Sequence, residues 1–281
     1  MYHGEGAFAF IMGIISGYPV GAKIVTKFRE DNVCTKEECE RLLAFTNNSG
    51  PLFIVGTVGI SLLGDVSIGI MLLIVHILAS ITVGIFFRFW KSKKELNRNY
   101  SFSYNYIPML KKRECENRGS LGNTQTVNFS NLGEILSKSI MNSINTIVMI
   151  GGFVVLFSVI ISILENSHAL EICSSLIYPL LNILQLPHEF ATGILSGIIE
   201  LTNGLQTISK IPIREYTQTI LLSSFLLGFG GISILLQVFS IISRTDISIK
   251  PYVMGKLLHA ILSVLYLFIF LNVFTCFSLN L

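Results

Sequence analysis

The stretch Asn47-Asn48-Ser49-Gly50-Pro51 lies in the middle of an uncharged segment, residues 42–64, that is long enough to cross a bilayer. Amides, a hydroxyl, a glycine and a proline at the centre of such a segment predict a broken helix, because polar backbone groups left unsatisfied in hydrocarbon are costly. A break of this kind is tolerated where protein or a water-filled cavity surrounds it. In transporters, broken helices place polar groups at mid-membrane, where they hold a solute or an ion.

The composition predicts an all-α polytopic membrane protein. Charged residues make up 13% of the chain and the mean hydropathy is +0.66, whereas about a quarter of an ordinary soluble domain is charged. Apolar segments of about twenty residues predict seven or eight membrane segments, including broken or re-entrant ones. The clearest are 66–87, 139–164, 218–243 and 252–276, and the less uniform are 6–22, 42–64, 170–186 and 190–209.

A polar insert divides the chain into two membrane halves. Basic residues cluster in 91–138, so the positive-inside rule predicts a flexible cytoplasmic linker between a first half, 1–90, and a second half, 139–281. The linker is either a simple solvated connection or a surface for partners and anionic lipid headgroups. The net charge of +3 is small and its basic residues lie between apolar segments, which indicates a lipid bilayer and no nucleic acid as partner.

The two halves resemble each other in sequence. A shift of 180 positions superposes Gly13-Ile14-Ile15-Ser16-Gly17 on Gly193-Ile194-Leu195-Ser196-Gly197, and the same shift aligns Gly50 with Gly230. If every candidate segment crosses, an odd number of crossings separates the copies, which predicts an inverted repeat of the kind from which many transporters are built. The alternative is chance similarity between apolar segments.

A second break is predicted near the beginning of the chain. Gly13, Gly17 and Gly21 share one helical face and permit close backbone approach, while Pro19 removes a backbone donor. A packed glycine face with a proline kink is the alternative. Further on, Thr35 and Glu38 fit a capping box and predict that a helix begins there.

Glu200 lies near the centre of segment 190–209 and is followed by Thr202 and Asn203. An ionisable group at that depth is a functional candidate. Either its carboxyl carries a proton, or the ionised form coordinates Na⁺ or solute hydroxyls together with Thr202 and Asn203. The alternative is a structural pairing with a Lys or His of another helix.

Three more ionisable residues lie inside apolar segments. His76 and His259 are candidates for a proton path or for hydrogen bonds to a neighbouring helix, and Lys256 is expected to reach the surface or to pair. The five cysteines form no CxxC pair and no zinc-like cluster with histidines, so no metal or cofactor is predicted, with H⁺ or Na⁺ as a possible coupling ion. No nucleophile–base pair is evident, which argues against an enzyme.

The predicted solute site combines both breaks and the acidic segment. Amide side chains both donate and accept hydrogen bonds, so they can replace the water around a polar solute, although they can also merely cap the broken helix ends. The candidate residues are Ser16, Gly17, Tyr18, Pro19, Thr46, Asn47, Asn48, Ser49, Gly50, Glu200, Thr202, Asn203 and Gly204.

Three motifs carry a family resemblance: Ser-Gly-Tyr-Pro-Val-Gly-Ala-Lys at 16–23, Phe-Thr-Asn-Asn-Ser-Gly-Pro-Leu-Phe at 45–53 and Glu-Leu-Thr-Asn-Gly at 200–204. With them the chain resembles, over nearly its whole length, the YlbJ-type sporulation integral membrane proteins. The resemblance implies a gate domain like that of nucleoside and ferrous iron transporters, a place in the mother-cell membrane or the membrane that surrounds the forespore, and a role in making the spore cortex. Because members of that family usually begin with further membrane helices, it also implies that the chain is truncated at its N-terminus.

Two functions follow as expectations. The first is a permease that moves a small polar solute across the membrane during sporulation. The second is a non-transporting scaffold for cortex assembly proteins, with the linker 91–138 as its docking surface.

Overall fold

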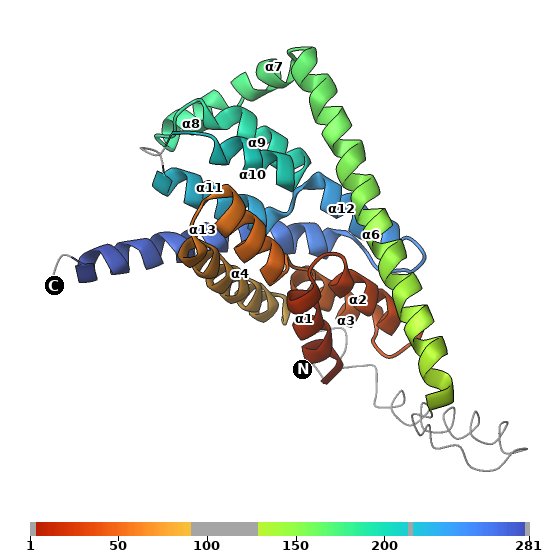
Figure 1. Cartoon of the computed structure of the whole chain (residues 1–281). Coiled ribbons are helices and arrows are strands. Elements are labelled where there is room, and N and C mark those ends of the chain that lie inside the picture. Colours follow the sequence, from red (N-terminus) through yellow and green to blue (C-terminus); the bar gives the residue numbers. More distant parts are fainter. Residues whose placement is uncertain (1–3, 91–128, 213–215, 279–281) are drawn as a thin grey trace, which may run out of the picture. The chain divides into compact units, whose positions relative to one another are not determined.

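The computed structural model describes residues 4–90, 129–212 and 216–278, and these residues form helices and connecting turns without strands (Figure 1). The all-α prediction is therefore confirmed for the described part of the chain. The chain forms two units, one of residues 1–88 with 149–281 and one of residues 89–148. Residues 91–128 of the predicted linker lie outside the described residues, while 129–138 form the first turns of a long helix.

The helices before the linker are α1 (Gly4–Ser16), α2 (Val20–Glu30), α3 (Lys36–Thr46), the π-helix η1 (Leu52–Leu62) and α4 (Val66–Phe87). Those after it are α6 (Phe129–Asn166), α7 (Ala169–Ser175), α8 (Tyr178–Ile183), α9 (Phe190–Ile199), α10 (Leu201–Ser209), α11 (Tyr216–Phe229), α12 (Gly231–Ile242) and α13 (Lys250–Ser278).

Four stretches of the described chain are long and apolar enough to cross a membrane: Val66–Phe87, Leu132–Asn166, Tyr216–Ile242 and Lys250–Asn272. They correspond to the four clearest predicted segments. Each of the less uniform segments is instead divided between two shorter helices. A total of seven or eight membrane segments stays a prediction.

Glycine and proline chemistry accounts for where the helices break. Gly17 (φ +73°) separates α1 from α2, and Gly230 (φ +88°) separates α11 from α12, both in a backbone region that favours glycine. Pro51 lies at the start of η1, where a missing N–H costs nothing. Glu200 is extended between α9 and α10. The 180-residue shift that aligns Gly50 with Gly230 also aligns Lys36 and Tyr216, the first residues of α3 and α11.

The capping box at the start of α3 is present as predicted. The Thr35 hydroxyl accepts from the Glu38 N–H, and the Glu38 carboxylate accepts from the Thr35 N–H at 2.8 Å. These two bonds satisfy backbone donors that a helix end otherwise leaves open. They fix where α3 begins and therefore where it delivers Asn47 and Asn48.

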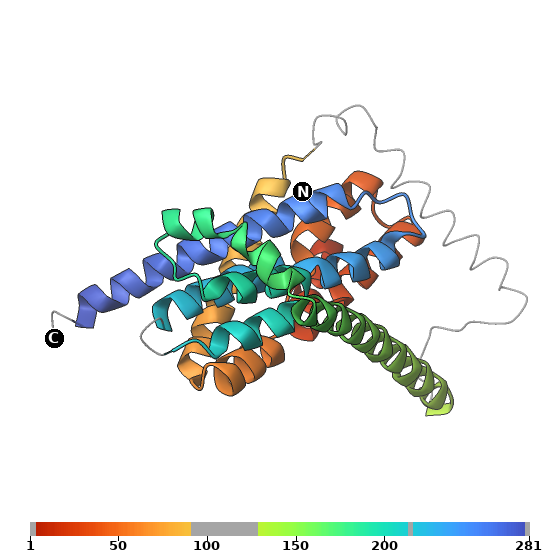
Figure 2. The ribbon, with the colours of Figure 1, turned by 90° about the horizontal axis from the view of Figure 1, so that it is seen from above.

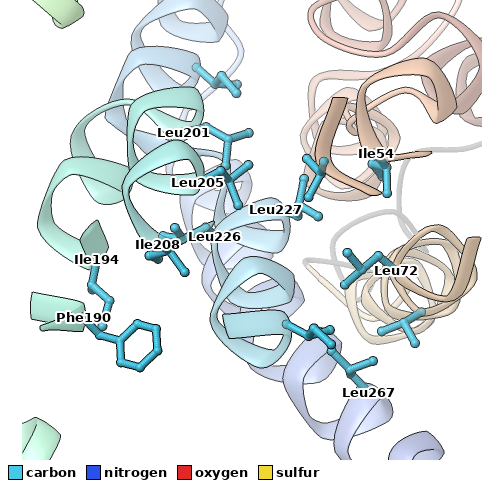
Figure 3. Close-up of a cluster of buried hydrophobic side chains, with 14 of the residues drawn as sticks. Ile54, Leu72, Phe190, Ile194, Leu201, Leu205, Ile208, Leu226, Leu227 and Leu267 are labelled. Carbon is cyan, nitrogen blue, oxygen red and sulfur yellow. The ribbon is translucent and has the colours of Figure 1, made fainter. Parts of the chain in front are cut away.

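A buried apolar cluster holds the second half together and joins it to η1 and α4 (Figure 3). Leu226 lies near Ile208 of α10, and Leu227 lies between α10 and Ile54 of η1. Lipid is as apolar as leucine, so tight packing contributes more here than removal from water. At Gly228 the backbone of α11 approaches that of α13 so closely that a Cβ would lie 2.7 Å from the Ala260 Cα.

Helix α13 packs against α3, α4 and α11 (Figure 2). Its first turns lie beside α3, where Gly255 meets the Ala44 carbonyl. Just before α13 begins, the Ser248 N–H donates to the Glu40 carboxylate of α3 at 3.2 Å. A helix of the second half is therefore anchored on a helix of the first.

Arg29 and Asp246 form a bidentate ion pair outside the membrane-spanning segments. Arg29 Nε donates to Asp246 Oδ1 at 2.6 Å, and Nη2 donates to Oδ2 at 2.9 Å. Hydrogen bonding to this guanidinium lowers the pKa of the Asp246 carboxyl below its ordinary value. The pair ties the last turn of α2 to the loop before α13.

Asp246→Asn is expected to reduce the stability near pH 7 by about 0.5 kcal/mol, a small effect because both side chains are partly exposed to solvent. Since the folded-state pKa is lowered, the ionised carboxylate stabilises the fold above its ordinary pKa of about 4, and this stabilisation is lost as the pH falls through the lowered value. Thermal unfolding in detergent should show a gap between wild type and variant at about pH 7 that closes at about pH 3. A gap of the same size at both would contradict this role.

Candidate functional site

Four helix breaks lie in the unit formed by residues 1–88 and 149–281. They are located at residues 17–19 between α1 and α2, 47–51 between α3 and η1, 200 between α9 and α10, and 230 between α11 and α12. Each break leaves the end of one helix and the start of another without a full set of backbone partners. Their positions relative to one another therefore decide where these polar groups gather.

The first two breaks touch through backbone. A Cβ on Gly17 would lie 2.9 Å from the Gly50 N, so no residue larger than glycine fits where these two backbone segments meet. Gly13 and Gly21, one turn to either side, both face the Thr46 carbonyl so closely that a Cβ would overlap it. The prediction that these glycines permit close backbone approach is confirmed, whereas the prediction that they share one helical face is wrong, because Gly17 lies in the break between α1 and α2.

Gly230 and Gly231 connect the first break to the third. A Cβ on Gly230 would lie 3.1 Å from the Tyr18 hydroxyl, and one on Gly231 would lie 3.3 Å from the Leu201 N. The fourth break is thus in contact with both the first and the third. We call residues 17–19, 47–51, 200–201 and 230–231 together the break centre.

Asn47 is fully engaged in holding the break centre together. Its Oδ1 accepts from the Ala22 N–H at 3.3 Å, which supplies an acceptor to the first turn of α2. Its Nδ2 donates to the Tyr252 hydroxyl of α13 at 3.0 Å. For Asn47, the alternative in which the amide caps a broken helix end agrees with the geometry.

Asn48 and Thr46 retain unused polar atoms. The Asn48 Nδ2 donates to the Phe45 carbonyl at 2.7 Å, but its Oδ1 and the Thr46 Oγ1 have no hydrogen-bond partner among the described residues. Both residues are fully buried. Because a buried polar atom without a partner is costly, these atoms can accept or donate to something that is not part of this chain. Ser49 is also buried and neighbours Tyr18.

Lys256 of α13 points into the break centre. It is 1% exposed, and its Nζ donates to the Tyr18 hydroxyl at 2.8 Å and lies 4.9 Å from the centroid of that ring. Lys256 was expected to pair, and its partner is Tyr18. Because Lys256 is buried, the alternative that its side chain reaches the surface is excluded. Among the described residues no carboxylate forms an ion pair with it.

Glu200 caps the helix that follows it. Its Oε2 accepts from the Asn203 N–H at 2.8 Å, and the side chain is buried next to the positive end of α10. The Asn203 side chain turns to α6, where its Nδ2 donates to the Ser158 hydroxyl at 2.9 Å. Neither a Lys nor a His pairs with Glu200 within the described residues.

The predicted site residues therefore form two groups. Gly17, Tyr18 and residues 46–50 come together directly, and Glu200 reaches them only through the Gly230–Gly231 backbone. Gly204 packs against Gly197, Thr202 is half-buried and Ser16 is exposed at the end of α1. The exposed Ser16 side chain therefore does not join either group.

Tyr252 was not among the residues predicted from the sequence, and no partner was predicted for Lys256, although both contact the break centre. Both lie on one face of α13, where they are spaced four residues apart in an otherwise apolar segment. That spacing, together with the charge inside the membrane segment, is the signal by which they could have been found. Their partners, Asn47 and Tyr18, are more than 200 residues away in the chain.

Comparison with known proteins identifies the class first. The Gate family, described as nucleoside recognition, matches residues 147–279, which include α7 to α13 and residues 200–201 and 230–231 of the break centre. This part of the chain is thus similar to a gate domain.

A curated relative then extends the similarity to nearly the whole chain. Over 265 residues, 94% of this chain and 63% of the relative, the chain is 34% identical to the sporulation integral membrane protein YlbJ of Bacillus subtilis (strain 168). As the three motifs predicted, the chain is similar over nearly its whole length to a YlbJ-type sporulation integral membrane protein, and it spans about 63% of that relative's length. This also confirms a multi-pass membrane protein. No solved structure matches the chain.

Proposed function

We propose that the protein moves a small polar solute across the membrane and that the break centre binds this solute. The observation that carries the proposal is the meeting of four helix breaks around buried polar atoms, above all Asn48 Oδ1 and Thr46 Oγ1, that have no partner among the described residues. Broken helices at membrane depth are stable where they line a solute path. A purely structural junction would satisfy its own polar atoms, as Asn47 does.

Lys256 indicates the charge of the solute. A buried ammonium group whose described contacts are tyrosines retains most of the cost of leaving water. A negatively charged group on the solute would offset that cost and would also accept from the Tyr18 hydroxyl. We therefore propose an anionic solute, with Thr46, Asn48 and Tyr18 contacting its polar groups.

The biological setting of the proposal comes from the relative and the motifs. The relative's name places it in sporulation. We propose that this protein acts during spore formation, in the membrane of the mother cell, and that the solute it moves is needed for the spore cortex. Two related halves in inverted orientation would let the break centre open to each side in turn. This role involves no chemical reaction on the solute.

The experiment compares the break centre with the linker in a spore-forming host. Asn48→Leu and Glu200→Gln are expected to reduce the number of heat-resistant spores at least about a hundredfold, because the first removes the polar atoms of a buried amide and the second replaces a buried ionisable carboxyl group by a neutral amide. Deletion of residues 98–125 should have little effect. Asn142→Leu, an exposed amide in the apolar part of α6, is the matched control.

The opposite pattern would overturn the proposal. A scaffold for cortex assembly proteins would fail when residues 98–125 are deleted and would tolerate Asn48→Leu and Glu200→Gln. Immunoblots of membrane fractions must show the same amount of protein for every variant, so that a loss of spores reports on function.

A further inference from the structure

One face of α13 carries a row of buried polar side chains. Tyr252, Lys256, His259 and Ser263 are each at most 1% exposed, and their spacing of four, three and four residues keeps them in line. The row extends to Tyr266, whose hydroxyl lies 2.8 Å from that of Thr82 on α4. At 1.5 Å per residue it covers about 21 Å of a hydrocarbon layer about 30 Å thick.

Two imidazoles meet in the middle of this row. The rings of His259 and of His76 on α4 are 4.3 Å apart between centroids, and both side chains are buried. The Nε2 of His259 lies 3.1 Å from the His76 carbonyl oxygen. Since a carbonyl only accepts, this nitrogen carries the hydrogen, and the Nδ1 of His259 then has a free lone pair.

Three ring nitrogens of the pair have no use within the fold. His76 Nδ1, His76 Nε2 and His259 Nδ1 are buried and lack a hydrogen-bond partner in the part of the chain that the structure describes. A histidine kept only for packing would bond these atoms to neighbouring carbonyls or hydroxyls. Unused imidazole nitrogens at this depth are available to take up and release a proton.

Groups that can exchange protons lie on both sides of the pair. Toward the break centre, Lys256 precedes His259 by about one turn and donates to Tyr18. On the other side, the Ser263 hydroxyl follows one turn later and has no partner among the described residues. The pair therefore connects the break centre with the end of the row.

Other ionisable groups on the neighbouring helices lie away from the pair. Helix α4 has only His76 and η1 has none, while Tyr216 at the start of α11 donates to the Leu63 carbonyl at the end of η1. On α3, Glu40 lies near Ser248, before α13 begins. The ionisable residues of α3 are Lys36, Glu37, Glu38, Cys39, Glu40 and Arg41.

We propose that His76 and His259 form a proton relay along α13, so that protons are the ions that drive the solute. The relay itself does not depend on the proposed function, whereas the coupling of protons to solute movement does. The Lys256 ammonium gives a proton to the free lone pair of one ring and is protonated again from the break centre. The resulting imidazolium passes a proton to the second ring, and the Ser263 hydroxyl accepts it while releasing its own proton toward the end of the row. One proton enters and one leaves, and no electrons are transferred. No cluster of three or more metal-ligating residues competes for this role among the described residues.

The test needs no knowledge of the solute. The full chain is reconstituted in liposomes adsorbed on a solid-supported membrane, and the charge displaced by a pH step from about 7.5 to about 6 is recorded in solute-free buffer. We expect a transient current in wild type. His76→Gln with His259→Gln should reduce the displaced charge about tenfold or more, because neither replacement can bind a proton. His188→Gln, which is exposed, should leave the current unchanged.

Two results would overturn the relay. The first is the absence of displaced charge in wild type, which requires no variant to fold. The second is an unchanged current in the double variant or in His259→Asn alone. The current is recorded without solute and therefore tests the relay alone, whereas the spore counts of Asn48→Leu and Glu200→Gln test the proposed transport. Loss of the relay and failure of the proposed transport are therefore distinguishable.

Discussion

Lys256→Met abolishes the binding of anionic solutes while the protein remains folded. This is the expected result because a buried ammonium group is the strongest electrostatic feature of the break centre, and methionine has nearly the same length without the charge. Loss of one partner from a buried charge pair costs about 3 kcal/mol or more. We therefore expect the affinity for an anionic solute to fall at least about a hundredfold.

Thermal unfolding with a panel of solutes measures this effect. The panel contains carboxylates and phosphate monoesters, neutral sugars and nucleosides, and amines. A solute that binds the folded state at about a hundred times its Kd stabilises it by about 2.7 kcal/mol. Anions should raise the Tm of wild type, whereas neutral solutes and amines should not.

The control is Lys250→Met on the same helix. Lys250 is exposed at the start of α13, so its replacement should preserve the anion-dependent rise in Tm. If Lys256→Met keeps the rise, or if neutral nucleosides raise the Tm of both proteins equally, the proposed anionic solute is wrong.

Gly204→Ala is expected to destabilise the fold strongly although it adds a single methyl group. A Cβ at this position would overlap the backbone of Gly197, and further backbone lies at the Gly193 carbonyl oxygen, 2.8 Å away. Backbone cannot turn aside as a flexible side chain can, so α9 and α10 must separate. Forced overpacking of this kind costs about 3 kcal/mol.

Gly151→Ala in α6 is expected to have the opposite effect on stability. No atom lies within 4 Å of the position that its Cβ would take, and alanine is favoured over glycine in a helix by about 1 kcal/mol. Unfolding in detergent should therefore show a lower Tm for Gly204→Ala and an equal or higher Tm for Gly151→Ala. Equal Tm values for Gly204→Ala and wild type would show that α9 and α10 do not pack through these glycines.

Local chemistry made the helix breaks predictable from the sequence. Pro19 and Gly50 act within one or two turns of the chain, so their effect does not depend on distant partners. The capping box at Thr35 is local for the same reason. The breaks at residues 200 and 230 were not predicted. The 180-residue shift aligned Gly230 with Gly50, but segment 218–243 was expected to be a plain apolar span.

The partners of the buried polar residues could not be predicted in this way. Lys256 meets Tyr18, and His259 meets His76, across 238 and 183 residues of chain. Spacing along one helix shows which residues share a face, but it does not show which other helix that face meets. For Glu200, depth in the membrane suggested a ligand, whereas its main contact is the N–H of Asn203, three residues away. That bond depends on the extended backbone at the break.

The central claim is that the break centre meets water and solute at membrane depth. Asn48→Cys, in a chain whose five native cysteines are replaced, is treated in liposomes with a membrane-impermeant, negatively charged methanethiosulfonate. We expect this cysteine to be modified and a cysteine at the exposed, lipid-facing position of Leu78 in α4 to remain unmodified. An Asn48→Cys protein that stays unmodified in the bilayer but reacts once unfolded would contradict it.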